Sequence, residues 1–369
     1  MTVVPYHALL AWLDLGDARS YWLWTGPLCV LTDGEAAVLL FFVLSGIALS
    51  WGSFHGGPDP FTGLRPTAAW LLARTVRICG PYLATLALMA VARTTLWDAA
   101  PTTPSRSSWF HHHGNVPATA ENVLHDLLLP AQYPRLVAQG WSLTEEMRFA
   151  FLLPLLLPVA ARSTAVTVVC LLLATVSAGL SRYVVYFAAG ILIAKHWKEL
   201  QCRLRSLSAS ESSALAVAGL ALYSFARWGP WHLSGVTRAI ETVIPSGDLA
   251  APGAALLLIV PMASPGIRRL LESHALQWLG RVSFSLYLVH LLPVFYLSPR
   301  IIRVLNGQGI GDPFFIAVLS AAAVVVCSLP LAWIFHRWVE SPCTLLARRI
   351  VSPSGPGPDT PSGESRPQS

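Results

Sequence analysis

Apolar stretches alternate with short polar segments along most of this 369-residue chain. The clearest is Gly34–Trp51, GEAAVLLFFVLSGIALSW, which is about as long as a membrane-spanning helix requires. Proline, glycine and charged residues separate the stretches. The pattern predicts an all-α fold, a polytopic helical membrane bundle with about ten transmembrane helices. The predicted spans are residues 1–13, 36–51, 67–92, 147–161, 164–180, 183–194, 214–226, 249–263, 280–297 and 313–335.

The two ends of the chain depart from this pattern. The first stretch, MTVVPYHALLAWL, is too short to cross a bilayer, so we interpret it as the second half of a helix. Either the true start codon lies further upstream or the first helix is truncated. Residues 351–369 are rich in Ser, Pro and Gly, which predicts a disordered tail. We expect one transmembrane domain over residues 1–350, followed by that tail.

Composition agrees with a membrane protein. Hydrophobic residues make up 54% of the chain and charged residues 12%, with a mean hydropathy of +0.55, whereas soluble domains are about one quarter charged. The formal net charge of +6 is explained by the excess of Lys and Arg that cytoplasmic loops of membrane proteins carry, so it does not indicate nucleic-acid binding. The six cysteines show no metal-ligand spacing, and we expect no structural disulfide. No cleavable signal peptide is predicted.

Four motifs lie in or beside the predicted spans. They are FFVLSGI at 41–47, ARTVRICGPY at 73–82, WSLTEE at 141–146 and GRVSFSLYLVH at 280–290. In this order they resemble the motifs of the membrane-bound acyltransferase-3 family, and the likeness covers nearly the whole chain. The resemblance implies a multi-pass enzyme of the bacterial inner (cytoplasmic) membrane. A cytoplasmic N-terminus places the larger share of Arg and Lys inside, as the positive-inside rule favours.

His7 lies in the short first stretch among apolar neighbours. A lone histidine in such a place is more often a packed core residue than a catalyst. The segment VVPYHALLAW resembles the end of the family's first helix, which implies that His7 is the catalytic base. Histidine suits this role because its pKa lies near neutrality. The arginine that the family pairs with it would precede Met1.

Arg74 and Arg77 are spaced i,i+3 and share one face at the start of the third span. Anchoring at the cytoplasmic membrane surface explains them as well as ligand binding does. A guanidinium group also binds phosphate bidentately. The family's Arg-x-x-Arg motif implies that both contact the phosphates of CoA, which would enter from the cytoplasm.

Two motifs contribute further polar residues. The resemblance places Glu146 on the family's glutamate, where it would hold an acceptor hydroxyl or orient His7; a carboxylate at a helix N-terminus explains it equally well. Ser283, Tyr287 and His290 follow i,i+4,i+7 and share a face. Polar side chains on a membrane helix point into protein or a water-filled cavity. His290 is therefore a second candidate for proton handling.

Three other features have competing interpretations. Ser45 is a candidate nucleophile for an acyl-enzyme, but the Ser45–Gly46 pair better suits a close helix crossing. Glu340 resembles the family's terminal Glu-x-Pro and would bind substrate or simply close the last helix. The run His111–His113 lies in a long polar loop, residues 101–139, and consecutive histidines cannot easily share one ion. We expect no metal.

We therefore expect an O-acyltransferase that moves an acyl group, acetyl in the first instance, from cytoplasmic acyl-CoA to a hydroxyl. The acceptor would be a carbohydrate, a cell-envelope glycan or a glycosylated secondary metabolite such as a macrolide. The last of these is included because SGIALSW resembles actinobacterial members of the family, some of which acylate macrolides. No permanently bound cofactor is expected. One alternative is a transporter or scaffold, although no related halves are found. Another is an inactive homologue, because the arginine of the family's first helix is missing and Leu39 replaces an acidic residue of the family.

Overall fold

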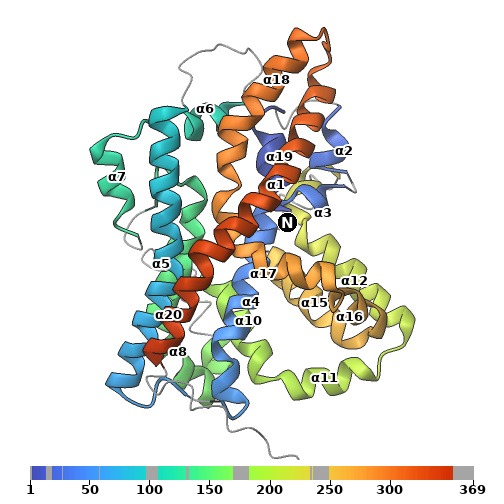
Figure 1. The fold of residues 1–369 in the computed structure, drawn as a ribbon. Helices are drawn as coiled ribbons and strands as arrows, with labels where there is room; N and C mark the ends of the chain where they lie inside the picture. Colours follow the sequence, from blue (N-terminus) through green and yellow to red (C-terminus); the bar gives the residue numbers. More distant parts are fainter. Residues whose placement is uncertain are drawn as a thin grey trace, which may run out of the picture.

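The computed structural model describes residues 2–13, 19–26, 28–57, 59–96, 107–129, 133–168, 183–232, 235 and 249–351. These residues are mostly helical and contain no strand, which confirms the all-α prediction (Figure 1). In chain order the elements are α1 (Val3–Leu10), α2 (Tyr21–Trp24), α3 (Cys29–Thr32), α4 (Gly34–Phe54), α5 (Leu64–Thr95), α6 (Ser108–Gly114), α7 (Ala120–Asp126), η1 (Ala138–Gly140), α8 (Trp141–Arg162), α10 (Val184–Lys195), α11 (Trp197–Arg205), α12 (Ala209–Tyr223), α13 (Phe225–His232), α15 (Ala250–Ala263), α16 (Pro265–Leu271), α17 (His274–Val289), η3 (Pro293–Leu297), α18 (Ser298–Gly307), α19 (Pro313–Phe335), η4 (His336–Glu340) and α20 (Ser341–Val351).

Several helices are long and apolar enough to cross a membrane. Within the described residues these are α4, α5 and the continuous helix Pro313–Val351, and a fourth span results if α17 and the segment Pro293–Gly307, bent by 55°, count as one. The predicted number of ten spans is not confirmed. Some predicted spans are shorter apolar helices, such as α10, and residues 169–182 lie outside the described part.

The helix α4 is fixed at its start and at its middle. Asp33 caps it, because its carboxylate accepts a hydrogen bond of 3.0 Å from the Ala36 amide. Further along, α4 crosses α10 so closely that a Cβ on Gly46 would lie 1.9 Å from the Phe187 carbonyl oxygen. A Cβ on Gly190 would likewise lie 2.1 Å from the Val43 oxygen. The predicted close crossing at Ser45–Gly46 is therefore confirmed.

The buried apolar side chains form two main clusters. One joins α1 with α5, the segment around η3, and α19; the other joins α4, α8, α10 and α15. Tyr287 on α17 packs against both clusters. The helix α17 therefore lies where the two clusters meet, and Figure 1 shows α1 beside α19, against which it packs.

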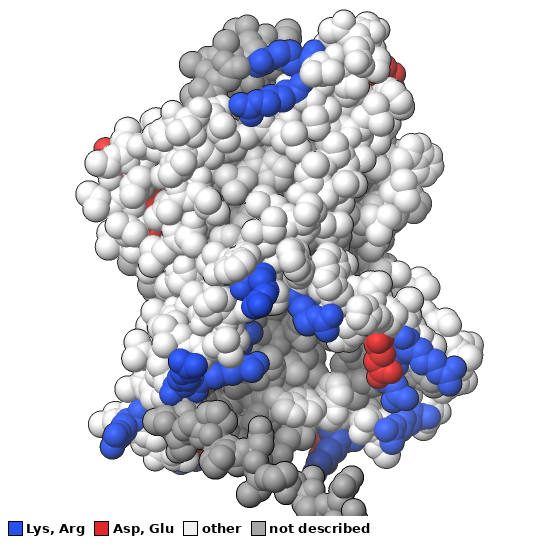
Figure 2. Space-filling view, viewed as in Figure 1, with Lys and Arg blue, Asp and Glu red and all other residues white. Residues whose placement is uncertain are grey.

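Charge is distributed unevenly over the surface. Figure 2 shows an uncharged band across the upper half of the visible face, between a few basic side chains at the top and a larger basic group in the lower half. Such a band is what a helical bundle presents to hydrocarbon.

Candidate active site

Two histidines that are far apart in sequence meet at the centre of the bundle. The Nδ1 atom of His7 lies 2.8 Å from Nε2 of His290, and the two rings stack with centroids 5.1 Å apart. His290 is fully buried at the end of α17, whereas His7 on α1 is half-buried. The structure thus joins two residues that sequence patterns indicated separately.

Hydrogen bonding determines which ring nitrogens carry protons. The Nδ1 atom of His290 lies 2.7 Å from the backbone oxygen of Tyr287, and a carbonyl can only accept, so this nitrogen is protonated. In neutral His290 the Nε2 atom is then an acceptor, and His7 donates to it from Nδ1. The free lone pair of His7 lies on Nε2, for which no partner occurs among the described residues. A neutral imidazole with a free Nε2 lone pair, held by a second ring, is suited to act as a general base.

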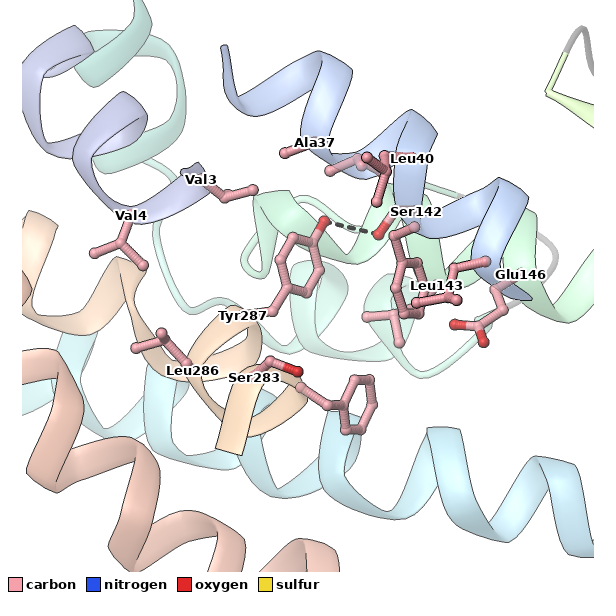
Figure 3. Close-up of a pocket in the computed structure, with 14 residues that line it drawn as sticks. Val3, Val4, Ala37, Leu40, Ser142, Leu143, Glu146, Ser283, Leu286 and Tyr287 are labelled. Carbon is pink, nitrogen blue, oxygen red and sulfur yellow. Dashed lines mark hydrogen bonds between the residues drawn. The ribbon is translucent and has the colours of Figure 1, made fainter. Parts of the chain in front are cut away.

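Figure 3 shows an apolar cavity of about 270 Å³, here the apolar chamber, whose walls include residues of α1 and α17 one helical turn before the two histidines; neither histidine lines it. Val3 and Val4 precede His7 on α1, and Tyr287 precedes His290 on α17. The chamber is lined by Val3, Val4, Ala37, Val38, Leu40, Phe41, Leu44, Ser142, Leu143, Glu146, Ser283, Phe284, Leu286 and Tyr287. Its polar edge includes Tyr287, whose hydroxyl lies 2.7 Å from the Ser142 hydroxyl and donates to the backbone oxygen of Gln139 at 2.7 Å.

A second cavity of about 550 Å³, here the arginine cavity, adjoins the chamber and shares Phe41, Glu146, Ser283 and Phe284 with it. Four arginines and two glutamates line it, and they are Arg74, Arg77, Arg281, Arg348, Glu146 and Glu340.

The arginines of this cavity fall into two kinds. Arg74 forms a buried ion pair with Glu146. Within the described part of the chain, no ion pair joins an acidic side chain to the exposed Arg77, Arg281 or Arg348. Such unpaired guanidinium groups suit a polyanionic ligand.

The comparisons with known proteins agree with this geometry. A family model described as an acyltransferase domain matches residues 1–337. The chain belongs to the acyltransferase-3 family.

Two curated acyltransferases are similar to this family member. Acyltransferase MdmB of Streptomyces mycarofaciens is 29% identical over 374 residues, which span 91% of this chain and 88% of that protein. Acyltransferase R4 of Phoma sp. is 29% identical over 138 residues, or 34% of this chain and 29% of that protein. No solved structure matches. The protein is an acyltransferase, and its family implies an acyl donor and a hydroxyl-bearing acceptor.

Residues of the four acyltransferase-3 motifs lie around the two cavities, but some of their contacts differ from those predicted from the sequence. The structure pairs Glu146 with Arg74 and not with His7, whose partner is His290. On α17, Ser283 and Tyr287 both line the apolar chamber, whereas Ser285, which is not on their shared face, donates to Glu340 at 2.6 Å. Ser45 is buried and lines neither of these two cavities.

Glu340 has structural contacts in addition to its place in the arginine cavity. Its Oε2 atom accepts the Ser285 bond and lies 2.9 Å from Nδ1 of His336. The Ser285 bond holds the π-helical turn η4 against α17, and the His336 contact lies within η4. Such π-helical turns are rare, and those that exist are frequently found at functional sites. Another one, η3, begins at Pro293, three residues after His290.

Sequence reasoning missed several residues of the site. Arg281 lies within the motif at 280–290, one helical turn before Phe284 of the cavity wall. This position within the motif is a signal that could have indicated Arg281. Arg348 follows the predicted end of the last span, and nothing in its local pattern indicates that α20 continues alongside α5 (Figure 1).

Proposed function

We propose that this acyltransferase moves an acyl group from cytoplasmic acyl-CoA to a hydroxyl of a carbohydrate or of a glycosylated secondary metabolite such as a macrolide. The observation that supports it is the order of environments in the bundle. Exposed arginines line one cavity, an apolar chamber adjoins it, and His7 with its free lone pair lies one helical turn from Val3 of the chamber wall, although it lines neither cavity. A CoA thioester has the same order of groups, with phosphates, a mostly apolar arm and a reactive carbonyl.

The donor would enter through the arginine cavity. Its phosphates would bind Arg77, Arg281 and Arg348, while Arg74 stays paired with Glu146. The pantetheine arm would lie in the apolar chamber and bring the thioester toward His7. This placement puts the arginine cavity on the cytoplasmic side of the inner membrane, because acyl-CoA is a cytoplasmic metabolite.

The chemistry is a direct transfer. The Nε2 atom of His7 takes the proton of the acceptor hydroxyl while the hydroxyl oxygen attacks the thioester carbonyl. The tetrahedral intermediate collapses with loss of the CoA thiolate, which receives the proton from His7. His290 holds the His7 ring in its working tautomer through the bond to Nδ1. No covalent acyl-enzyme is required, and Ser45 lies outside both cavities.

The acceptor class rests on relatives and motifs. One likeness, which covers 91% of the chain, is to an acyltransferase of a Streptomyces species, and the segment Ser45–Trp51 resembles actinobacterial members. The proposal names acetyl as the first donor to test, and longer acyl groups as the next.

The experiment is a thiol-release assay with the full-length protein in lipid nanodiscs. Acetyl-CoA and longer acyl-CoA donors are supplied with a panel of glycosides, glycans and macrolides, and free CoA thiol and acylated products are measured. We expect thiol release that depends on one acceptor class and an O-acyl product of matching mass. Absence of release with every donor and acceptor would favour an inactive homologue.

A further inference from the structure

The outer face of His7 is covered by an aromatic side chain that the transfer chemistry above leaves without a role. The Trp109 ring stacks on the His7 ring, with centroids 5.0 Å apart and planes inclined by 19°. His290 stacks on His7 at a similar distance and inclination. The His7 ring therefore has two ring neighbours, Trp109 from α6 and His290 from α17, and the 2.8 Å contact between Nδ1 of His7 and Nε2 of His290 joins the two imidazoles at their edges.

Trp109 is itself firmly positioned. Its ring stacks on Phe295 at 5.7 Å, and Phe295 belongs to the π-helical turn η3 that follows His290. The next residue on α6, Phe110, is fully buried and packs edge-on against the same Phe295 at 5.5 Å.

Both ends of α6 are tied to helices of the site. At its start, the Ser107 amide donates to the Ala11 oxygen of the α1 end at 3.1 Å. At its end, the Arg93 guanidinium of α5 donates to the backbone oxygens of His113 and Gly114. The short helix thus spans from α1 to α5 and carries Trp109 with it, although this region was predicted to be a polar loop.

A charged group and a neutral histidine lie beside the stacked rings, and the Arg93 guanidinium is 5.4 Å from the Phe295 centroid. His113 contacts Trp109 with ring centroids 5.3 Å apart. Burial, together with the smaller effects of His112 and Arg93, lowers the pKa of His113 to about 4, so His113 is neutral at pH 7. An indole face is favourable for an adjacent cation. It would stabilise the imidazolium that His7 becomes when it takes a proton.

We propose that Trp109 is a positioning residue of the transfer reaction, which holds the His7 ring against His290 and closes the histidine pair on its outer side. This inference rests on the proposed function, since it is His7 as a base that Trp109 would serve. A misplaced base costs up to ~10²-fold in rate even when the substrate still binds. Trp109 should therefore act on turnover and not on donor affinity.

The test compares Trp109→Leu, Trp109→Phe and the matched control Trp22→Leu, whose tryptophan is 61% exposed on α2. Each full-length variant is placed in nanodiscs, and kcat and KM for acyl-CoA are measured by thiol release. In parallel, the rate at which diethyl pyrocarbonate modifies His7 is measured by mass spectrometry, without any substrate.

We expect Trp109→Leu to lower kcat about 10- to 100-fold with KM for acyl-CoA within about twofold, and to speed modification of His7 several-fold. Trp109→Phe, which keeps an aromatic face, should recover much of both, and Trp22→Leu should change neither. Unchanged kcat together with unchanged His7 modification in Trp109→Leu would overturn the proposal, as would equal losses in the Leu and Phe variants. If wild-type protein releases no thiol, the proposed function fails by itself, and the modification rates still decide whether Trp109 covers His7.

Discussion

The histidine pair and the arginine cavity, which lie at the two ends of the proposed reaction path, are formed by different kinds of side chain. At the histidine pair, aromatic rings from α1, α6 and α17 stack closely, and the partner of each histidine is a neutral group. At the arginine cavity, exposed guanidinium groups from α5, α17 and α20 surround a larger space. The first arrangement suits proton transfer, which depends on precise placement. The second suits capture of an anion, which depends on charge. Changes at the two ends should therefore separate into effects on turnover and effects on donor affinity.

The buried ion pair between them explains how one arginine of the motif differs from the other. Arg74 and Glu146 are both largely buried, and a buried charge needs a partner. Arg77 is exposed and lacks an acidic partner among the described side chains, so it can meet a ligand. We therefore propose a structural role for Arg74 and a ligand-binding role for Arg77.

The largest expected effect is at the histidine pair. Replacing His7 with Ala removes the proposed base, and general base catalysis contributes about 10²- to 10⁴-fold. Acyl transfer by the purified variant should fall by at least that factor in the thiol-release assay, while membrane insertion and CoA binding persist. Transfer at the wild-type rate would remove His7 from the mechanism.

Arg77→Ala should act at the other end of the path. Loss of one charge-assisted contact to phosphate at an exposed position should raise KM for acyl-CoA about tenfold, with kcat nearly unchanged. Steady-state kinetics at several salt concentrations would measure it. The matched control is Arg268→Ala, whose exposed side chain lies 3.8 Å from Glu272 and outside the arginine cavity. A fall in kcat without a change in KM would contradict the division of roles.

A smaller effect is expected where the two regions join. Tyr287→Phe keeps the ring in the chamber but removes the hydroxyl that meets Ser142 and donates to the Gln139 oxygen. A net hydrogen bond contributes about 0.5–1.5 kcal/mol, so kcat/KM should fall about 2- to 10-fold. Kinetics with one donor and one acceptor would show it. A loss as large as that of His7→Ala would instead place the Tyr287 hydroxyl in the chemistry.

The smallest effect should come from a helix start far from both regions. Ser208 caps α12, since its side chain accepts from the Glu211 amide and the Glu211 carboxylate accepts from the Ser208 amide. Ser208→Ala should lower the free energy of unfolding by about 1 kcal/mol and leave the rate of acyl transfer unchanged. Hydrogen bonds from Ser208 hold the pKa of Glu211 below its usual value of 4.5, so this contribution is present above that pH and is lost as the pH falls. Melting curves at neutral and acidic pH would test it, and equal losses at both would contradict the assignment.

Local patterns predicted the individual helices better than their assembly. The span 36–51 corresponds to α4, because a long apolar run with a Ser-Gly pair leaves few other structures. The last span was predicted to end at 335, but the helix continues to Val351, since its amphipathic end packs on α5. The segment 101–139 was predicted to be a loop but contains the short helices α6 and α7. Their many polar residues did not indicate membrane-type helices.

The site shows the same limit. His7 was indicated by the resemblance to the family's first helix, and His290 by the polar face that it shares with Tyr287. Nothing local reveals that these residues, 283 positions apart, share a hydrogen bond. Glu146 was found from its motif, whereas its pairing with Arg74 depends on how α5 and α8 pack. Trp109 resembles any interfacial tryptophan in sequence, and only the fold places it against His7.

The central claim is that a CoA thioester carbonyl reaches Nε2 of His7 through the arginine cavity. Bromoacetyl-CoA tests it directly, because it places an electrophilic carbon beside the donor carbonyl and alkylates a nearby nucleophile with loss of bromide. Peptide mass spectrometry of the treated protein should find the adduct on His7, and an excess of CoA should prevent it. Label that appears on Cys79 or Cys343, with His7 unmodified and no protection by CoA, would contradict the account.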